Sequence, residues 1–318
     1  MIKDAGLLDR RPVYYLLRLA LVTVAFAGGW LLFVSVGDSW WQLAVAVFLA
    51  VVFAQVALVA HDLAHRQVFR SRSSSAVAGR IAGNLGIGMS YGWWMEKHNR
   101  HHANPNHEDH DPDVDPSLLV WSEEQASRAT GLSRFIARRE AWLFFPLLTL
   151  EAWNLHVSGL RSLRTIRGRV LEGALLLAHF AWFFGLIFAT LPVGKAIVFV
   201  LLHQAVFGVY LGCTFAPNHK GMPVLTAEDE LDYLRKQVLT SRNVRGGVAI
   251  DVLLGGLNYQ IEHHLFPNMP TPNLRRAQPI VRDYCASLGV PYAEAGLIES
   301  YGIALRHMHR IGAELRAS

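Results

Sequence analysis

Four long apolar stretches constrain the fold of this chain more than any other feature of its sequence. They cover residues 13–36, 40–60, 170–190 and 193–215. A bilayer has an apolar core about 30 Å thick, and a helix needs about 20 residues to cross it. Only the short turns 37–39 and 191–192 separate the members of each pair. The sequence therefore predicts two antiparallel pairs of transmembrane helices. Buried helices of a large soluble core are the weaker alternative.

The distribution of charge predicts how these helices are oriented. Charged residues make up 17% of the chain and the mean hydropathy is +0.24, whereas soluble proteins usually carry about 25% charged residues. Fourteen basic residues lie between positions 66 and 169 and eleven follow from position 220, but the turn at 37–39 has none. The positive-inside rule then places both termini and the segments 61–169 and 216–318 in the cytoplasm. The pI of 9.4 fits loops that face anionic lipid, and no nucleic-acid partner is expected.

The chain reads as one domain over residues 1–318. Two spans are followed by a cytosolic insert (61–169), two further spans and a cytosolic tail (216–318). The segment 141–160 is also apolar, but Pro146 and several polar residues interrupt it. We expect this segment to form an interfacial helix or a short re-entrant helix rather than a fifth span.

Histidines gather at the predicted cytoplasmic side of the membrane. The chain has 15 histidines, and many of them fall into three short clusters or follow the fourth span directly. Residues three and four positions apart project from one face of a helix, so the side chains of each cluster point together. The residues concerned are His61 and His65; His98, His101 and His102; Gln260, His263 and His264; and the isolated His219.

Eight imidazoles on one side of a membrane indicate metal binding. Neutral imidazole suits first-row transition metals such as iron, and eight rings exceed the four ligands that one zinc ion takes. Two metal ions, with room for a bridging oxygen or for O2, are the natural interpretation. A zinc hydrolase would need an HExxH carboxylate, which the sequence lacks. A transporter would need ionisable groups at mid-membrane, where only His179 and His203 come close.

Polar residues near the clusters are candidates for orienting the histidine rings. A metal-bound imidazole usually donates its second N–H to a carboxylate or a carbonyl. The acidic segment 111–116 and the residues beside the clusters provide such groups. Each of these acids could equally be a solvated loop residue or a helix cap. The candidates are Asp62, Asp111, Asp113, Asn218 and Glu262.

At these positions the sequence resembles the membrane fatty-acid desaturase family. The marks of that family are three histidine boxes, which here read HDLAH (61–65), HNRHH (98–102) and QIEHH (260–264). The extended third box, NYQIEHHLFP (258–267), resembles the branch of acyl-CoA and acyl-lipid desaturases in which glutamine replaces the first histidine. The similarity runs from about residue 61 to residue 272.

This resemblance implies an all-α integral membrane fold in which four transmembrane helices carry a cytosolic helical cap with a di-iron site. It implies two iron ions, and it puts Gln260 at a position that is a ligand in relatives with a third HxxHH, where Gln260 could contact iron directly or through water. The residues that match the family's ligand positions are His61, His65, His98, His101, His102, His219, His263 and His264.

The implied reaction is O2-dependent desaturation of a fatty acyl chain, which introduces a cis double bond. The sequence contains no HPGG haem motif, so we expect electrons from a separate ferredoxin, rubredoxin, flavoprotein reductase or cytochrome b5. The acyl tunnel would have aromatic walls, for which Trp93, Trp94, Phe207, Tyr210 and Phe215 are candidates, although each could be an ordinary core aromatic. A lipid or alkane hydroxylase, or a carotenoid ketolase or hydroxylase, would share the same ligands and is the alternative.

Overall fold

The computed structural model describes residues 1–115 and 119–317 and is mostly helical. It divides into two compact units, each made of segments that are distant in sequence. The membrane unit comprises Asp9–Glu96 and Leu148–Gly212, and the histidine unit comprises Met1–Leu8, Lys97–Leu147 and Cys213–Ser318. The prediction of a single domain over the whole chain stays a prediction.

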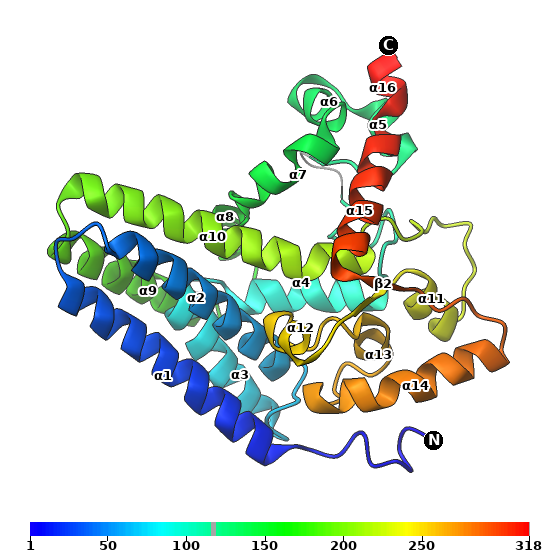
Figure 1. Cartoon of the computed structure of the whole chain (residues 1–318), viewed down its shortest axis with the longest axis horizontal. Helices are drawn as coiled ribbons and strands as arrows, with labels where there is room; N and C mark the ends of the chain where they lie inside the picture. The colour runs from blue at the N-terminus through cyan, green and yellow to red at the C-terminus, as the bar shows by residue number, and fades with distance from the viewer. Residues whose placement is uncertain (116–118, 318) are drawn as a thin grey trace. The chain divides into compact units, whose positions relative to one another are not determined.

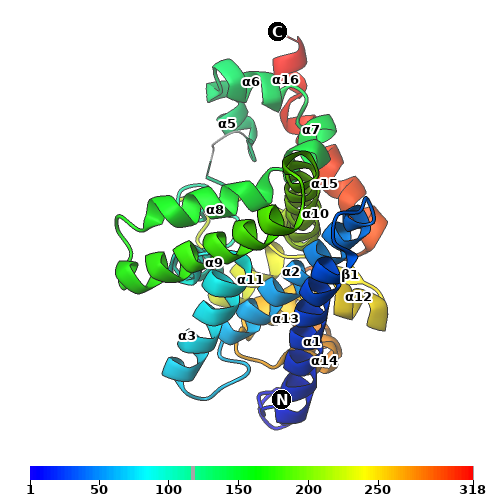
Figure 2. The ribbon, with the colours of Figure 1, turned by 90° about the vertical axis from the view of Figure 1, so that its left-hand side faces the viewer.

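The membrane unit is built on four long apolar helices, which confirms the predicted all-α membrane fold. They are α1 (Pro12–Val36), α2 (Gln42–Ala64), α9 (Arg169–Thr190) and α10 (Val193–His219), and all four are long and apolar enough to cross a bilayer. Figures 1 and 2 both show α1 beside α2. In its most apolar part, α2 is 67% buried and α1 only 17%. The apolar surface that α1 leaves exposed suits contact with lipid.

Two of these helices extend further than predicted. The apolar stretches end at residues 60 and 215, but α2 continues to Ala64 and α10 to His219. The hydropathy of the sequence falls at these histidines, but the helical hydrogen bonds of the backbone continue to Ala64 and His219. His61 and His219 therefore belong to the same helices as the second and fourth spans.

Shorter helices complete the membrane unit. After α2 come α3 (Arg72–Arg80), a π-helix (Ile81–Gly86) and the start of α4 (Tyr91–Ala103); the last residue of α7 (Glu140–Leu148) and all of α8 (Glu151–Ser162) precede α9. The segment 141–160 is thus two short helices rather than a fifth span. Its predicted interfacial position stays a prediction.

Polar side chains stabilise the irregular backbone around the π-helix. His179 Nδ1 and Trp182 Nε1 each donate to the Leu85 carbonyl at 3.0 Å, and His156 Nδ1 donates to the Gly88 carbonyl at 2.8 Å. Buried carbonyl groups need such partners. His156 is therefore a buried residue of this unit. His203 is also buried here, where its ring centroid lies 4.6 Å from that of Phe53.

The histidine unit consists of short helices and one small sheet. It contains the end of α4, the end of α10 and most of α7. Strands β1 (Asn243–Arg245) and β2 (Glu294–Gly296) pair in parallel, with Val244 opposite Ala295. The other helices are α5 (Glu123–Arg128), α6 (Gly131–Ala137), α11 (Tyr233–Leu239), α12 (Val248–Leu253), α13 (Gln260–Leu265), α14 (Thr271–Ser287), α15 (Leu297–Ile311) and α16 (Ala313–Ala317).

An apolar core holds α13, the helix of the third histidine cluster, against its neighbours. Figure 1 shows α11, α13 and α14 beside one another. Val238 of α11, Ile261 and Leu265 of α13, and Val281 and Cys285 of α14 form a common buried cluster. The short histidine helix α13 is therefore fixed on two sides.

Candidate metal centre

Three histidines from three helices converge in the histidine unit. His101 comes from α4, His219 from the last residue of α10 and His264 from α13. Ring nitrogens of the three lie within 4.8 Å of one another, and all three residues are buried. The sequence places these residues far apart, and the fold brings them to one point.

Each of these rings is anchored through its Nδ1 atom. His101 Nδ1 lies 2.9 Å from Asp111 Oδ2, and His219 Nδ1 lies 3.0 Å from the Thr240 carbonyl oxygen. His264 Nδ1 lies 2.9 Å from Gln237 Oε1. Because every partner is an oxygen acceptor, Nδ1 carries the proton in each ring. The lone pair of each ring then lies on Nε2, which is the arrangement expected of metal-binding histidines.

The second nitrogen of the His264 ring, Nε2, is buried. Among the residues that the structure describes, no hydrogen-bond partner reaches its buried Nε2. Burial, together with the neighbouring His102, His219 and His101, holds the pKa of His264 well below its usual range. A neutral imidazole with an unused buried lone pair fits a transition metal.

The acidic partner of His101 gives this ring a different electrostatic environment. Burial lowers the pKa of His101, but the carboxylates of Asp111 and Asp113 outweigh burial and raise it overall. Asp111 also accepts the Asn106 backbone N–H at 2.7 Å. Asp113 lies further away, at 3.5 Å from His101 Nδ1, and forms an ion pair with Lys97 at 2.6 Å.

A second group of ring nitrogens lies in the same unit. His102 Nε2 is 3.0 Å from His98 Nε2 and 3.2 Å from His263 Nε2. Ligand nitrogens about 2.1 Å from one metal ion and about 90° apart would be about 3 Å from each other. His98, His102 and His263 thus form a second group that could hold a metal ion.

The first histidine cluster belongs to the membrane unit. His61 lies in the last turn of α2 and His65 caps that helix, with their ring centroids 4.7 Å apart. Asp62 Oδ1 is 3.5 Å from His61 Nδ1, and Asp62 Oδ2 accepts from Arg18 at 2.7 Å. Burial and the neighbouring His61 hold the pKa of His65 well below its usual range.

Two candidates for orienting the rings have other contacts. Glu262 accepts hydrogen bonds from Tyr292 Oη at 2.6 Å and from Asn243 Nδ2 at 2.8 Å, and the second of these bonds connects α13 to β1. Asn218 Nδ2 donates to Gln260 Oε1 at 3.2 Å. The roles predicted for Glu262 and Asn218 towards the metal stay predictions.

Several residues that hold the site histidines in place belong to no recognisable sequence motif. Gln237 and Thr240, which hold His264 and His219, belong to or follow α11. Arg242 is buried and donates to the Pro217 carbonyl (Nε, 3.0 Å) and the Lys220 carbonyl (Nη2, 2.9 Å). It thereby binds the end of α10, where His219 lies. A basic side chain at a helix C-terminus is the only general signal that could have suggested this role.

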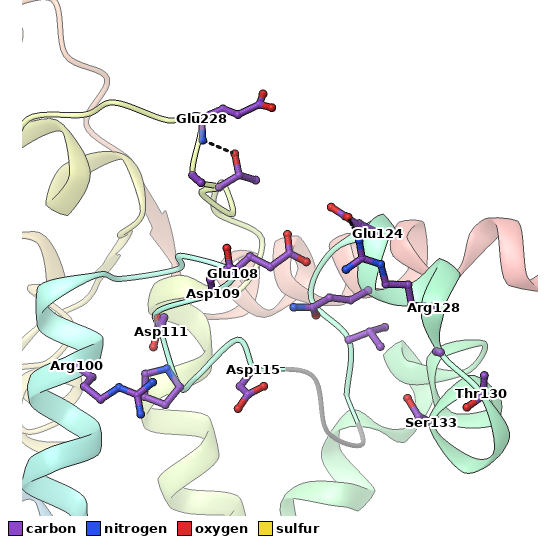
Figure 3. A pocket seen from close by; sticks show the side chains of 16 residues that line it. Arg100, Glu108, Asp109, Asp111, Asp115, Glu124, Arg128, Thr130, Ser133 and Glu228 are labelled. Atoms are coloured by element: carbon purple, nitrogen blue, oxygen red, sulfur yellow. Dashed lines mark hydrogen bonds and ion pairs between the residues drawn. The ribbon is translucent and has the colours of Figure 1, made fainter.

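An acidic pocket of about 920 Å³ opens beside Asp111 in the histidine unit. Figure 3 shows Glu108, Asp109, Asp115 and Glu124 around it. Carboxylates line this pocket, so it does not suit an apolar acyl chain. None of the five predicted tunnel aromatics lines it, and their role stays a prediction. Residue 116, at the end of the predicted acidic segment, lies outside the described residues.

The helices and the histidine groups together define a class of protein: a multi-span helical membrane protein whose histidines could hold metal ions. A family model described as "Fatty acid desaturase" matches residues 38–296. The chain belongs to the fatty acid desaturase family, as its three histidine boxes predicted.

Related proteins carry desaturase names. The "Acyl-lipid (9-3)-desaturase" of Physcomitrium patens is 32% identical over 303 residues, which cover 90% of this chain and 56% of that protein. In Caenorhabditis elegans, a "Delta(5) fatty acid desaturase" is 31% identical (92% of this chain, 67% of that protein). A "Delta(6)-fatty-acid desaturase" of the same organism is 26% identical (99% and 74%). The chain thus spans about half to three quarters of the length of these relatives.

Proposed function

We propose that this chain is an O2-dependent desaturase of fatty acyl chains, carried as acyl-lipid or acyl-CoA, that uses two iron ions. The observation that carries the proposal is the group His101, His219 and His264, in which each Nδ1 is held by an oxygen acceptor. The names of the relatives, which include Delta(5), Delta(6) and acyl-lipid desaturases, support the reaction class.

The proposed ligands are all eight histidines of the boxes and the fourth span. In the histidine unit, His101, His219 and His264 would hold one ion, and His98, His102 and His263 would contribute to the other. His61 and His65 are proposed as further iron ligands because they match the family's first histidine box. Imidazole ligands suit iron, and the shell of Asp111, Thr240 and Gln237 would keep the rings in the required tautomer.

The reaction removes two hydrogens from adjacent methylenes and forms a cis double bond. Two electrons, two protons and one O2 are consumed, and two waters are released. Bound iron ions would activate the O2, which is the oxidant, and side chains alone could not do this. A separate ferredoxin, rubredoxin, flavoprotein reductase or cytochrome b5 would supply the electrons. The protein's own residues would position the ligands and the acyl chain.

Fatty-acid analysis of an expressing host tests this function. We expect gas chromatography–mass spectrometry to find new unsaturated acyl chains with the wild type, and none with His101→Ala or His264→Ala, because each variant loses one ring of the centre. His309→Ala is the matched control, since His309 is an exposed histidine of α15. New hydroxy or keto products without new double bonds would support the hydroxylase alternative instead.

A further inference from the structure

The Gln260 side chain lies between Asn218 and the His219 ring. Its Nε2 is 2.8 Å from His219 Nε2, and its Oε1 accepts from Asn218 Nδ2 at 3.2 Å. Gln260 is 4% exposed and Asn218 is 0% exposed. The Gln260 amide is therefore buried and contacted at both ends, with its oxygen beside Asn218 and its nitrogen beside His219.

Asn218 determines which end of the Gln260 amide faces His219. Asn218 Nδ2 also faces two backbone carbonyls, Thr214 O at 3.2 Å and Leu257 O at 3.1 Å. A carbonyl oxygen can only accept hydrogen bonds, so the Asn218 atom at this place must be the nitrogen. That nitrogen cannot accept a hydrogen bond, so an NH2 group of Gln260 would have no partner beside it, and the Gln260 atom there is the oxygen Oε1. The Gln260 NH2 group is left facing His219.

The orientation of Gln260 matters for metal binding because only its oxygen could act as a ligand. The lone pair of an amide nitrogen is delocalised into the carbonyl group. His219 presents its Nε2 lone pair here, because its Nδ1 donates to the Thr240 carbonyl at 3.0 Å. Once a metal takes that lone pair, the N–H of Gln260 loses its acceptor. An oxygen ligand of the metal, such as water, is the acceptor left within reach.

We propose that Gln260 is a positioning residue and not a metal ligand. Asn218 holds its amide so that an N–H group points to the metal-facing edge of His219 and donates to an oxygen ligand there. This inference rests on the proposed function, because it concerns the same metal centre. Of the two alternatives for Gln260, direct contact with iron or contact through water, it favours the second. Asn218 then orients the Gln260 amide.

Iron retention tests the proposal without relying on turnover. The purified wild type, Gln260→Ala and His219→Ala are loaded with Fe²⁺ in detergent, and iron per chain is measured after dialysis against a chelator. We expect Gln260→Ala to retain as much iron as the wild type, with turnover reduced about tenfold or more by loss of the donor. His219→Ala, the ligand control, should lose iron. If Gln260→Ala loses iron as His219→Ala does, Gln260 is a ligand and the proposal is wrong.

A second variant tests the orientation of the amide. Gln260→Glu keeps one oxygen for Asn218 and replaces the N–H with a carboxylate oxygen that can bind metal. We expect this variant to retain iron about tenfold more strongly against the chelator than the wild type, whereas an original oxygen ligand would leave retention nearly unchanged. Thermal unfolding of each variant checks the fold. A wild type that binds no iron would overturn the proposed function as well, which separates the two failures.

Discussion

At the scale of single residues, Glu140 shows how burial sets the protonation of a carboxyl group. It is 1% exposed, and its Oε2 accepts one hydrogen bond, from the Val120 N–H at 3.3 Å. No described residue donates to its Oε1. Burial raises the pKa of Glu140 to about 8, against the opposing effects of the Val120 N–H and Lys220. The folded protein therefore keeps this proton near neutral pH.

The stability of the protein should fall as pH rises because of this residue. Between its ordinary pKa of 4.5 and about 8, the folded state holds a proton that the unfolded state releases. Within that window the free energy of unfolding decreases by at most about 1.4 kcal/mol per pH unit. Glu140→Gln does not titrate, so its stability relative to the wild type should increase from pH 5 to pH 8. Thermal unfolding in detergent at both pH values measures this, and an equal difference at the two would contradict it.

The sequence predicted the histidines of the site better than the groups that orient them. Spacings of three and four residues bring His98, His101 and His102 to one helix face, and this follows from helix geometry alone. Gln237 and Thr240 could not be identified in this way. Their contacts with His264 and His219 arise from how α11 packs, and a hydrogen bond between distant segments leaves no pattern in the sequence.

At the scale of the elements, α10 packs closely on the junction of α7 and α8. A Cβ atom on Gly208 would lie 2.5 Å from the Leu148 carbonyl oxygen and 2.9 Å from the Ala152 nitrogen. Both neighbours are backbone atoms, which cannot turn aside as a flexible side chain could. The absence of a side chain at position 208 is therefore required for this contact.

Gly208→Ala should destabilise the membrane unit. Relief of the clash requires the backbones to separate, at a cost of roughly 1–3 kcal/mol. Gly185→Ala on α9 is the matched control, because nothing lies within 4 Å of its added Cβ. In the control, alanine should stabilise the helix by about 0.5–1 kcal/mol. Unfolding of both purified variants in detergent compares them, and equal stabilities would show that the packing at Gly208 is not required.

Hydropathy predicted the existence of the long helices, but it could not predict their ends. The apolar stretches stop before His61 and His219, whereas α2 and α10 include these residues. The short helices of the histidine unit were beyond prediction for another reason. Helices such as α11 and α13, of seven and six residues, are too short to be stable alone and form only because they pack against neighbours.

At the scale of the whole molecule, the distribution of basic residues leads to a prediction about orientation. The turn between α1 and α2 should face away from the cytoplasm, and the tail after α10 should lie within it. Single cysteines at Asp38 and Glu228 can report this, in a background where Cys213 and Cys285 are replaced by alanine. Both chosen positions are exposed.

We expect an impermeant thiol reagent to label Asp38→Cys in intact cells. Glu228→Cys should react with this reagent only after the cells are permeabilised, because the tail is expected on the cytoplasmic side. Labelling of both cysteines before lysis would exclude the predicted topology. The reverse pattern would place the histidine-bearing tail on the outside and remove it from cytoplasmic electron donors.

The continuity of α10 from Val193 to His219 limits how the length of this chain can change during evolution. Each residue inserted into a helix turns everything beyond it by about 100° and advances it by about 1.5 Å. One extra residue in the last turns of α10, from Cys213 onward within the histidine unit, would swing His219 away from His101 and His264, although hydropathy would hardly change. Insertions in the connection at Leu191 and Pro192 leave that angular relation intact. Length variation among descendants of this sequence should therefore accumulate in the connection and be absent from the helix, except as whole turns.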